Sequence, residues 1–184
     1  MSNAPAIPEL LLNIARNPIT AAGIPLTLGV LSGLPTRKVV RGQWWNSLYK
    51  APLQPPGYAF GTVWPALYLS MGYASHLTAK ALDAAASNHT TDDLNLGLQL
   101  YYAQLGMNFL WTPLFFVAKK PGLALINITA LTGTTYYLTK LLHDATDGAT
   151  TLFMAPYCAW LTFATYLNGT TWYLNRGRYV RKFD

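Results

Sequence analysis

Charged side chains are scarce in this chain. Of its 184 residues only 11% are charged and 52% are hydrophobic, whereas soluble domains usually carry roughly a quarter charged residues. The charges also leave long gaps, because none falls in residues 17–36, 51–79, 94–118, 121–139 or 148–175. As a helix even the shortest gap is roughly 28 Å long, close to the thickness of a bilayer's hydrocarbon core. The pattern predicts an all-α, polytopic membrane protein with a bundle of five transmembrane helices.

The expected helices cover about residues 18–34, 56–82, 94–118, 123–142 and 149–174. A soluble helical bundle is the alternative, but it needs polar outer faces at helical spacing, whereas these segments read apolar all round. Residues 1–17 are expected to be a mobile or interfacial N-terminal lead, residues 18–175 the five-helix transmembrane domain, and residues 176–184 a basic C-terminal tail. The connectors are too short for a soluble domain.

The few charges divide between two sides of the expected membrane. The first and third connectors and the C-terminal tail carry ten basic residues against one acidic residue, Asp184. The other side carries three basic residues against six acidic ones. By the positive-inside rule, the protein is a multi-pass membrane protein with its C-terminus in the cytoplasm. The sequence pI of about 9.5 therefore reports topology and does not indicate nucleic-acid binding.

Residues for metal or disulfide chemistry are equally sparse. Cys158 is the single cysteine and has no intrachain partner. The three histidines lack the paired spacing of a metal site, so we expect no metal bound by protein ligands alone. His76, four residues before Lys80, is an interfacial residue or an axial haem ligand. The N-terminus also lacks the pattern of a cleavable signal peptide.

Catalytic patterns are missing as well. No carboxylate lies within an expected span, which argues against a coupled ion transporter. The chain has no glycine-rich phosphate loop and no recognisable serine, histidine and acid combination. We therefore assign no catalytic residue and no required cofactor.

Aromatic side chains are abundant. Trp44, Trp45, Trp172 and Tyr173 lie where interfacial aromatic belts occur. Three other tryptophans and two amides lie deeper in the spans, and these amides need hydrogen-bond partners from another helix or from a ligand. They are Trp64, Trp111, Trp160, Asn108 and Asn168.

Proline and glycine also punctuate the expected spans. Pro25, Pro65, Pro113 and Pro156 each remove a backbone donor and are expected to bend their helices, which leaves room for a cavity. Gly29 and Gly33 form a GxxxG pair, for which packing within the bundle is favoured over a dimer seam.

Three long motifs resemble the TspO/translocator protein family, the tryptophan-rich sensory proteins also called peripheral-type benzodiazepine receptors. They are "WWNSLYKAPLQPPGYAFGTVWPALYLSMGYAS", "QLYYAQLGMNFLWTPLFF" and "APYCAWLTFATYLNGTTWYLN". The resemblance covers about residues 44–175. It implies a five-helix bundle that binds flat apolar ligands, namely porphyrins or haem, sterols and benzodiazepine-type molecules, under the loop between the first two helices.

The resemblance also implies particular residues and settings. A sterol-recognition stretch corresponds to Leu167, Tyr173 and Arg176, for which interfacial anchoring is the stronger interpretation. By family precedent the resemblance is compatible with a homodimer, located in the cell membrane if the protein is bacterial and in the mitochondrial outer membrane or endoplasmic reticulum if it is eukaryotic. The matching pocket positions are Trp45, Tyr58, Trp64, Asn108, Trp111, Leu123, Trp160, Ala164 and Leu167.

Departures from the family pattern bear on function. Tyr58 stands where the family usually has a tryptophan linked to light-dependent porphyrin breakdown, so this enzymatic alternative loses support. Leu53, Thr62 and Leu123 also replace family residues. The expected function is a membrane-embedded binding protein or sensor for porphyrin or haem that takes part in their transport or scavenging; sterol or lipid transport is the other alternative.

Overall fold

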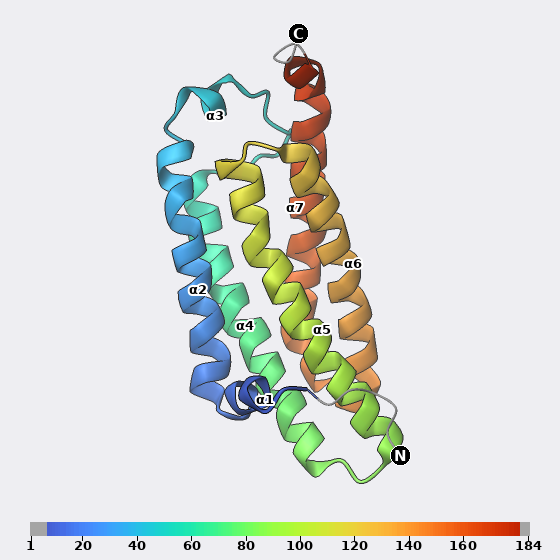
Figure 1. The fold of residues 1–184 in the computed structure, drawn as a ribbon. Coiled ribbons are helices and arrows are strands. Elements are labelled where there is room, and N and C mark those ends of the chain that lie inside the picture. Colours follow the sequence, from blue (N-terminus) through green and yellow to red (C-terminus); the bar gives the residue numbers. More distant parts are fainter. Residues whose placement is uncertain (1–6, 181–184) are drawn as a thin grey trace.

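The computed structural model describes residues 7–180, and every regular element in this range is helical. Five long helical segments lie side by side along one axis (Figure 1). They are α2 (Pro18–Val39), α4 (Gly57–Ala84), α5 (Asn88–Thr112) with the π-helical turn η1 (Pro113–Val117), α6 (Pro121–Ala145) and α7 (Ala149–Val180). Each corresponds to one predicted segment, with ends that run up to a turn or two further.

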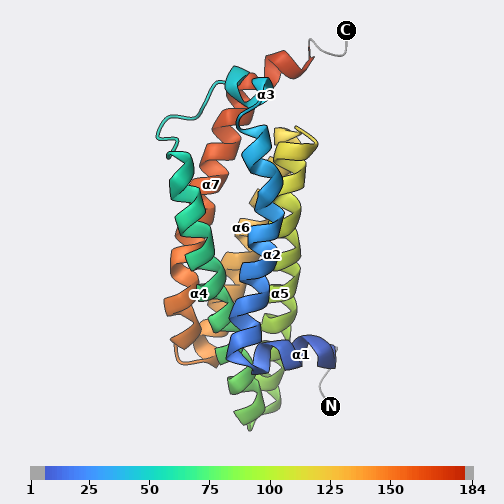
Figure 2. The ribbon, with the colours of Figure 1, turned by 90° about the vertical axis from the view of Figure 1, so that its left-hand side faces the viewer.

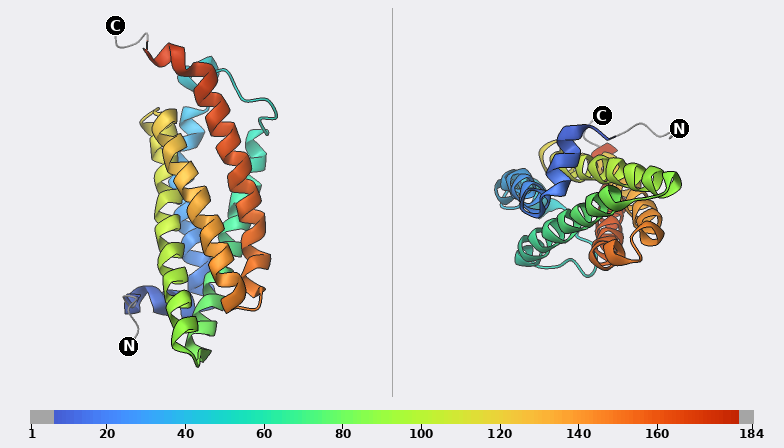
Figure 3. Two further views of the ribbon diagram at one scale, coloured as in Figure 1. Left: turned by 90° about the vertical axis from the view of Figure 1, so that its right-hand side faces the viewer. Right: turned by 90° about the horizontal axis from the view of Figure 1, so that it is seen from below.

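Two short helices lie at opposite ends of this bundle (Figure 2). Helix α1 (Glu9–Arg16) crosses the end formed by the α4–α5 and α6–α7 turns, as the view from below in Figure 3 shows. Helix α3 (Gln43–Ser47) belongs to the connector between α2 and α4 at the other end. The two sets of charges predicted to face opposite sides therefore occupy opposite ends of the bundle. Arg181, Lys182 and Asp184, which complete the basic set, lie outside the described residues.

The helix starts follow local sequence signals. The Asn17 side chain accepts hydrogen bonds from the backbone N–H groups of Ile19 (2.9 Å) and Thr20 (3.4 Å), and Pro18 occupies the first turn of α2. Ser87 caps α5 in the same way through the N–H of Thr90 (3.2 Å). These caps satisfy donors that a helix cannot satisfy itself.

The N-terminal lead contains α1, which docks on the bundle through polar contacts. Arg16 forms a two-pronged salt bridge with Asp83 of α4, with N···O distances of 2.7 and 3.0 Å. Tyr102 of α5 donates a hydrogen bond to the Leu11 carbonyl (2.7 Å). The α1 side chains of Leu12 and Ala15 are buried in a cluster with Ala79 of α4 and Leu98 of α5. The lead is therefore anchored along part of its length.

Small residues join α2 to α4. Gly29 lies directly against the ring of Tyr68, since a Cβ built on Gly29 would be 2.1 Å from Tyr68 Cε2. Gly72 of α4 lies equally close to the backbone of Ala21. A Cβ on Gly33 would meet nothing within 4 Å. The predicted role of Gly29 in packing within the bundle is thus confirmed, and Gly33 takes no part in that contact.

By length and mean hydropathy, α2 is the one helix of the described range that qualifies as membrane-spanning. The other long helices fall short because they carry many polar side chains; α6, for example, has five threonines between Thr129 and Thr139. The expectation that all five segments read apolar all round is not met on this measure.

Candidate ligand-binding site

A chain of buried polar groups runs through the middle of the bundle. Tyr68 of α4 donates a hydrogen bond to Asn108 Oδ1 of α5 (2.6 Å), and Asn108 Nδ2 donates to the hydroxyl of Tyr157 in α7 (2.9 Å). Tyr157 in turn donates to Gln104 Oε1 of α5 (2.8 Å). All four side chains are buried, and a buried polar group needs a hydrogen-bond partner. Each member of this chain supplies that partner to its neighbour. The amide of Asn108 is thus satisfied by other helices.

A tryptophan cluster adjoins this polar chain, and we define it as Phe60, Trp64, Trp160 and Phe163. The rings of Trp64 and Trp160 meet edge to face at 6.3 Å and 88°. Phe60 and Phe163 lie 5.7 and 5.8 Å from Trp160. Trp64 also contacts Tyr157 at 6.4 Å, which joins the cluster to the polar chain. The cluster offers aromatic faces and edges of the kind on which a planar ligand stacks.

One polar atom in the tryptophan cluster has no partner. Trp160 Nε1 is buried and forms no hydrogen bond in the structure. An indole N–H is a donor only, and leaving it unpaired costs on the order of 1–3 kcal/mol. A ligand carbonyl or carboxylate would satisfy it.

A second group of aromatic residues lies at the basic end of the bundle. Trp111 stacks on Phe115 at 5.0 Å, and its Nε1 donates to Asn168 Oδ1 (2.9 Å). Asn168 Nδ2 donates to the carbonyl of Pro121 (2.9 Å), so this amide also bonds between helices. Trp45 from the α2–α4 connector adds its ring at 5.5 Å from Phe116. This group closes the basic end of the bundle.

The α2–α4 connector is fastened over the same end. The Asn175 side chain of α7 accepts from the Tyr49 N–H (3.0 Å) and donates to the Tyr49 carbonyl (2.9 Å). Tyr166 donates to the Pro52 carbonyl at 3.2 Å. The Lys50 ammonium lies 3.7 Å from the centre of the Trp45 ring and donates to the Trp45 carbonyl. Its partial burial lowers the pKa of Lys50 below its ordinary value.

The predicted pocket residues fall into three groups. Trp64, Asn108, Trp160 and Ala164 come together in the buried core around the polar chain and the tryptophan cluster. Trp45 and Trp111 lie in the aromatic group at the basic end, and Leu167 is buried. Tyr58 and Leu123 instead point outward, with 79% and 49% of their surfaces exposed.

Sequence reasoning did not select five residues that build this site. Tyr68 and Phe60 flank Trp64 by one helical turn, Tyr157 and Phe163 lie three residues to either side of Trp160, and Gln104 precedes Asn108 by four. Residues three or four apart share a helix face. Extending each selected residue by one turn would have found all five.

The remaining candidates serve other contacts. His76 Nδ1 lies 3.1 Å from the Ala15 carbonyl and so helps to hold α1. Leu167 is 6% exposed whereas Tyr173 is 57% exposed and stacks on Arg176, at 4.2 Å from ring centre to guanidinium carbon. The sterol-recognition stretch therefore does not present one continuous surface. Within residues 7–180, no group of three or more potential metal ligands is found.

Two surface pockets lie away from the tryptophan cluster. One of about 570 Å³ lies between α6 and α7, and another of about 450 Å³ lies beside the α4–α5 and α6–α7 turns. Neither is lined by a residue of the cluster or of the polar chain. The candidate interior site is therefore defined by its aromatic and amide side chains and is separate from both surface pockets.

The fold and the buried side chains together define the protein as a tryptophan-rich helical bundle with a core of aromatic and amide groups. The chain belongs to the TspO/MBR family, whose model matches residues 21–174. It is 38% identical over 161 residues to the translocator protein homolog of Schizosaccharomyces pombe, covering 87% of this chain and 93% of that protein. It is 36% identical to the human translocator protein over 73% and 76% of the two chains. It is 32% identical to the tryptophan-rich protein TspO of Chlorobaculum tepidum over 72% and 79%. The protein is thus a membrane protein of this family.

Proposed function

We propose that the protein is a membrane-embedded binding protein for a flat apolar tetrapyrrole, a porphyrin or haem, and that it takes part in sensing, transporting or scavenging this ligand. The ligand lies in the bundle interior, where it displaces side chains around Trp64 and Trp160 and is covered by the α2–α4 connector. The observation that carries the proposal is the unpaired Nε1 of Trp160 inside a cluster of aromatic rings. Such a site offers stacking surface together with a free donor for a ring substituent.

The proposal includes five membrane crossings. The threonine hydroxyls that lower the hydropathy of α6 donate to backbone carbonyls of their own helix, as Thr132 does to Ile128 (2.7 Å) and Thr135 to Leu131 (2.8 Å). Hydroxyls satisfied in this way enter a bilayer at much lower cost than free ones. The basic end faces the cytoplasm by the positive-inside rule.

Haem titration of the purified protein, followed by the haem absorbance band, tests this function. Loss of the Trp160 indole N–H in Trp160→Phe is expected to raise Kd by about 3- to 10-fold, the equivalent of the roughly 0.5–1.5 kcal/mol contributed by one hydrogen bond. Trp172→Phe, a matched change outside the cluster, leaves Kd unchanged. Failure of the wild type to saturate, or equal effects of both variants, rejects the site.

Sterol binding is tested in the same titration. A sterol that displaces haem shares the bundle interior, whereas independent binding belongs to another surface. Light-dependent loss of the porphyrin band that disappears in Trp160→Phe would instead support the degradative alternative. We expect stable absorbance, because Tyr58 replaces the family tryptophan and its side chain is 79% exposed.

A further inference from the structure

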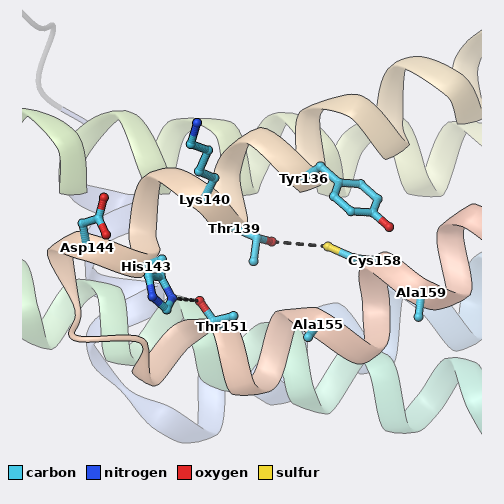
Figure 4. A pocket seen from close by; sticks show the side chains of 9 residues that line it. All are labelled: Tyr136, Thr139, Lys140, His143, Asp144, Thr151, Ala155, Cys158 and Ala159. Atoms are coloured by element: carbon cyan, nitrogen blue, oxygen red, sulfur yellow. Dashed lines mark hydrogen bonds between the residues drawn. The ribbon is translucent and has the colours of Figure 1, made fainter.

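A groove on the outer surface of the bundle differs from the interior site in position and chemistry. It runs between α6 and α7, has a volume of about 570 Å³ and is open to the outside of the bundle (Figure 4). This volume lies in the range of roughly 300–1,000 Å³ found for small-molecule sites. Its lining residues are Tyr136, Thr139, Lys140, His143, Asp144, Thr151, Ala155, Cys158 and Ala159.

Three hydrogen bonds between α6 and α7 involve residues that line the groove. Thr139 Oγ1 lies 3.4 Å from Cys158 Sγ, and His143 Nδ1 lies 2.9 Å from Thr151 Oγ1 (Figure 4). The Tyr136 hydroxyl lies 3.0 Å from Thr162 Oγ1. These contacts occupy the polar groups between the helices. What remains for a ligand is the charged α6 rim and the small apolar residues of α7.

The chemistry of the groove changes along its length. Lys140 and Asp144 lie near the α6–α7 turn, at the acidic end of the bundle, one helical turn apart on α6. Ala155 and Ala159 line the part that extends toward the middle of α7. Among the described residues neither Lys140 nor Asp144 forms an ion pair. The groove therefore offers a positive and a negative charge at the membrane surface and an apolar channel leading inward.

We propose that this groove binds a zwitterionic glycerophospholipid. In such a lipid the acyl chain, the phosphate and the terminal ammonium follow one another outward from the bilayer centre. The groove presents their complements in the same order, with Ala155 and Ala159 for the acyl chain, Lys140 for the phosphate and Asp144 for the ammonium. A lipid with only negative charge would meet Asp144, and an uncharged sterol would leave both charges without partners.

Native mass spectrometry of the full-length protein in mild detergent tests the proposal. The protein is incubated with equal amounts of dioleoyl phosphatidylcholine and dioleoyl phosphatidylglycerol, and the retained lipids are counted. The wild type is expected to retain phosphatidylcholine about fivefold more, the equivalent of roughly 1 kcal/mol from two partly exposed charges. Equal retention, or a preference for phosphatidylglycerol, overturns the proposal.

Two pairs of variants locate the lipid. Neutralising the rim with Lys140→Gln and Asp144→Asn is expected to abolish the fivefold preference, whereas Lys80→Gln with Asp147→Asn, the same change at the same end but outside the groove, preserves it. Filling the channel with Ala159→Phe lowers retention of both lipids, and Ala130→Phe, on an exposed part of α6 outside the groove, does not. Wild-type retention in Ala159→Phe overturns the proposal. The Kd for haem of the same variants is expected to equal that of the wild type. Lipid binding in the groove is thus tested independently of ligand binding in the interior site.

Discussion

At the residue scale, Gly29 shows how closely a single position is constrained. It places the backbone of α2 against the ring of Tyr68, and the hydroxyl of that ring donates to Asn108. A side chain at position 29 would therefore displace the first member of the buried polar chain. Packing between these two helices and the order of the site depend on the same glycine.

Gly29→Ala is expected to destabilise the protein by about 1–3 kcal/mol, because its Cβ would overlap Tyr68 and force the ring to move. Gly33→Ala, one turn further along α2, meets nothing within 4 Å and is expected to be neutral or slightly stabilising through helix propensity. Thermal unfolding in detergent, followed by near-ultraviolet circular dichroism, compares the two. Similar midpoints would show that Gly29 does not form the predicted contact.

At the scale of elements, the α2–α4 connector depends on α7 for its position. Both backbone groups of Tyr49 bond to the buried side chain of Asn175, and Pro52 receives a weaker hydrogen bond from Tyr166. Leu53 adopts a positive φ of 63°, which costs energy for a residue other than glycine. Hydrogen bonds from side chains of α7 thus help to hold the connector in this shape.

Asn175→Leu removes both hydrogen bonds to Tyr49 at similar side-chain volume. Losing these hydrogen bonds lowers the free energy of opening the connector by about 1–2 kcal/mol. Amide exchange in residues 48–55 is therefore expected to become roughly 5- to 30-fold faster. Tyr166→Phe removes one 3.2 Å bond and is expected to have a smaller effect. Hydrogen exchange with mass spectrometry provides the measurement, and unchanged exchange in Asn175→Leu would contradict the fastening role.

The positions of the long helices could be predicted from the gaps between charges, because a helix in an apolar bundle carries its charges at its ends. Helix α1 could not be predicted so simply, since its docking depends on Asp83 and Tyr102, distant in sequence. Of the tryptophans expected deep in the spans, Trp64 and Trp160 pack against the buried core, as expected with Asn108, whereas Trp111 lies in the aromatic group at the basic end. The exposure of Tyr58 and Leu123 could not be predicted from the sequence, because a motif identifies a position without showing which way its side chain points.

At the scale of the whole molecule, the division of charge between two ends sets the expected orientation. The connector helix α3 and the α4–α5 turn lie at opposite ends of the bundle. They carry exposed residues, Asn46 and Ala86, at which a label can be attached without disturbing the core.

Single cysteines introduced as Asn46→Cys and Ala86→Cys, in a Cys158→Ala background, are expected to react with an impermeant maleimide from opposite sides of the membrane. Asn46→Cys should be labelled only after the cytoplasmic side is opened, and Ala86→Cys in intact cells or vesicles. Labelling of both from one side would rule out the proposed crossings.

The π-helical turn at Pro113–Val117 also has a consequence for how the chain can be altered. Its wider hydrogen-bond ring, from the Ala118 N–H to the Pro113 carbonyl (2.8 Å), lets the successive side chains of Phe115 and Phe116 both be buried. A regular α-helix sets neighbouring residues about 100° apart around its axis, so deleting one residue of this turn, which would restore that geometry, would move one of the two rings off the buried face. The extra residue in the π-helical turn thus lets the end of this segment pack two adjacent aromatic side chains against the bundle.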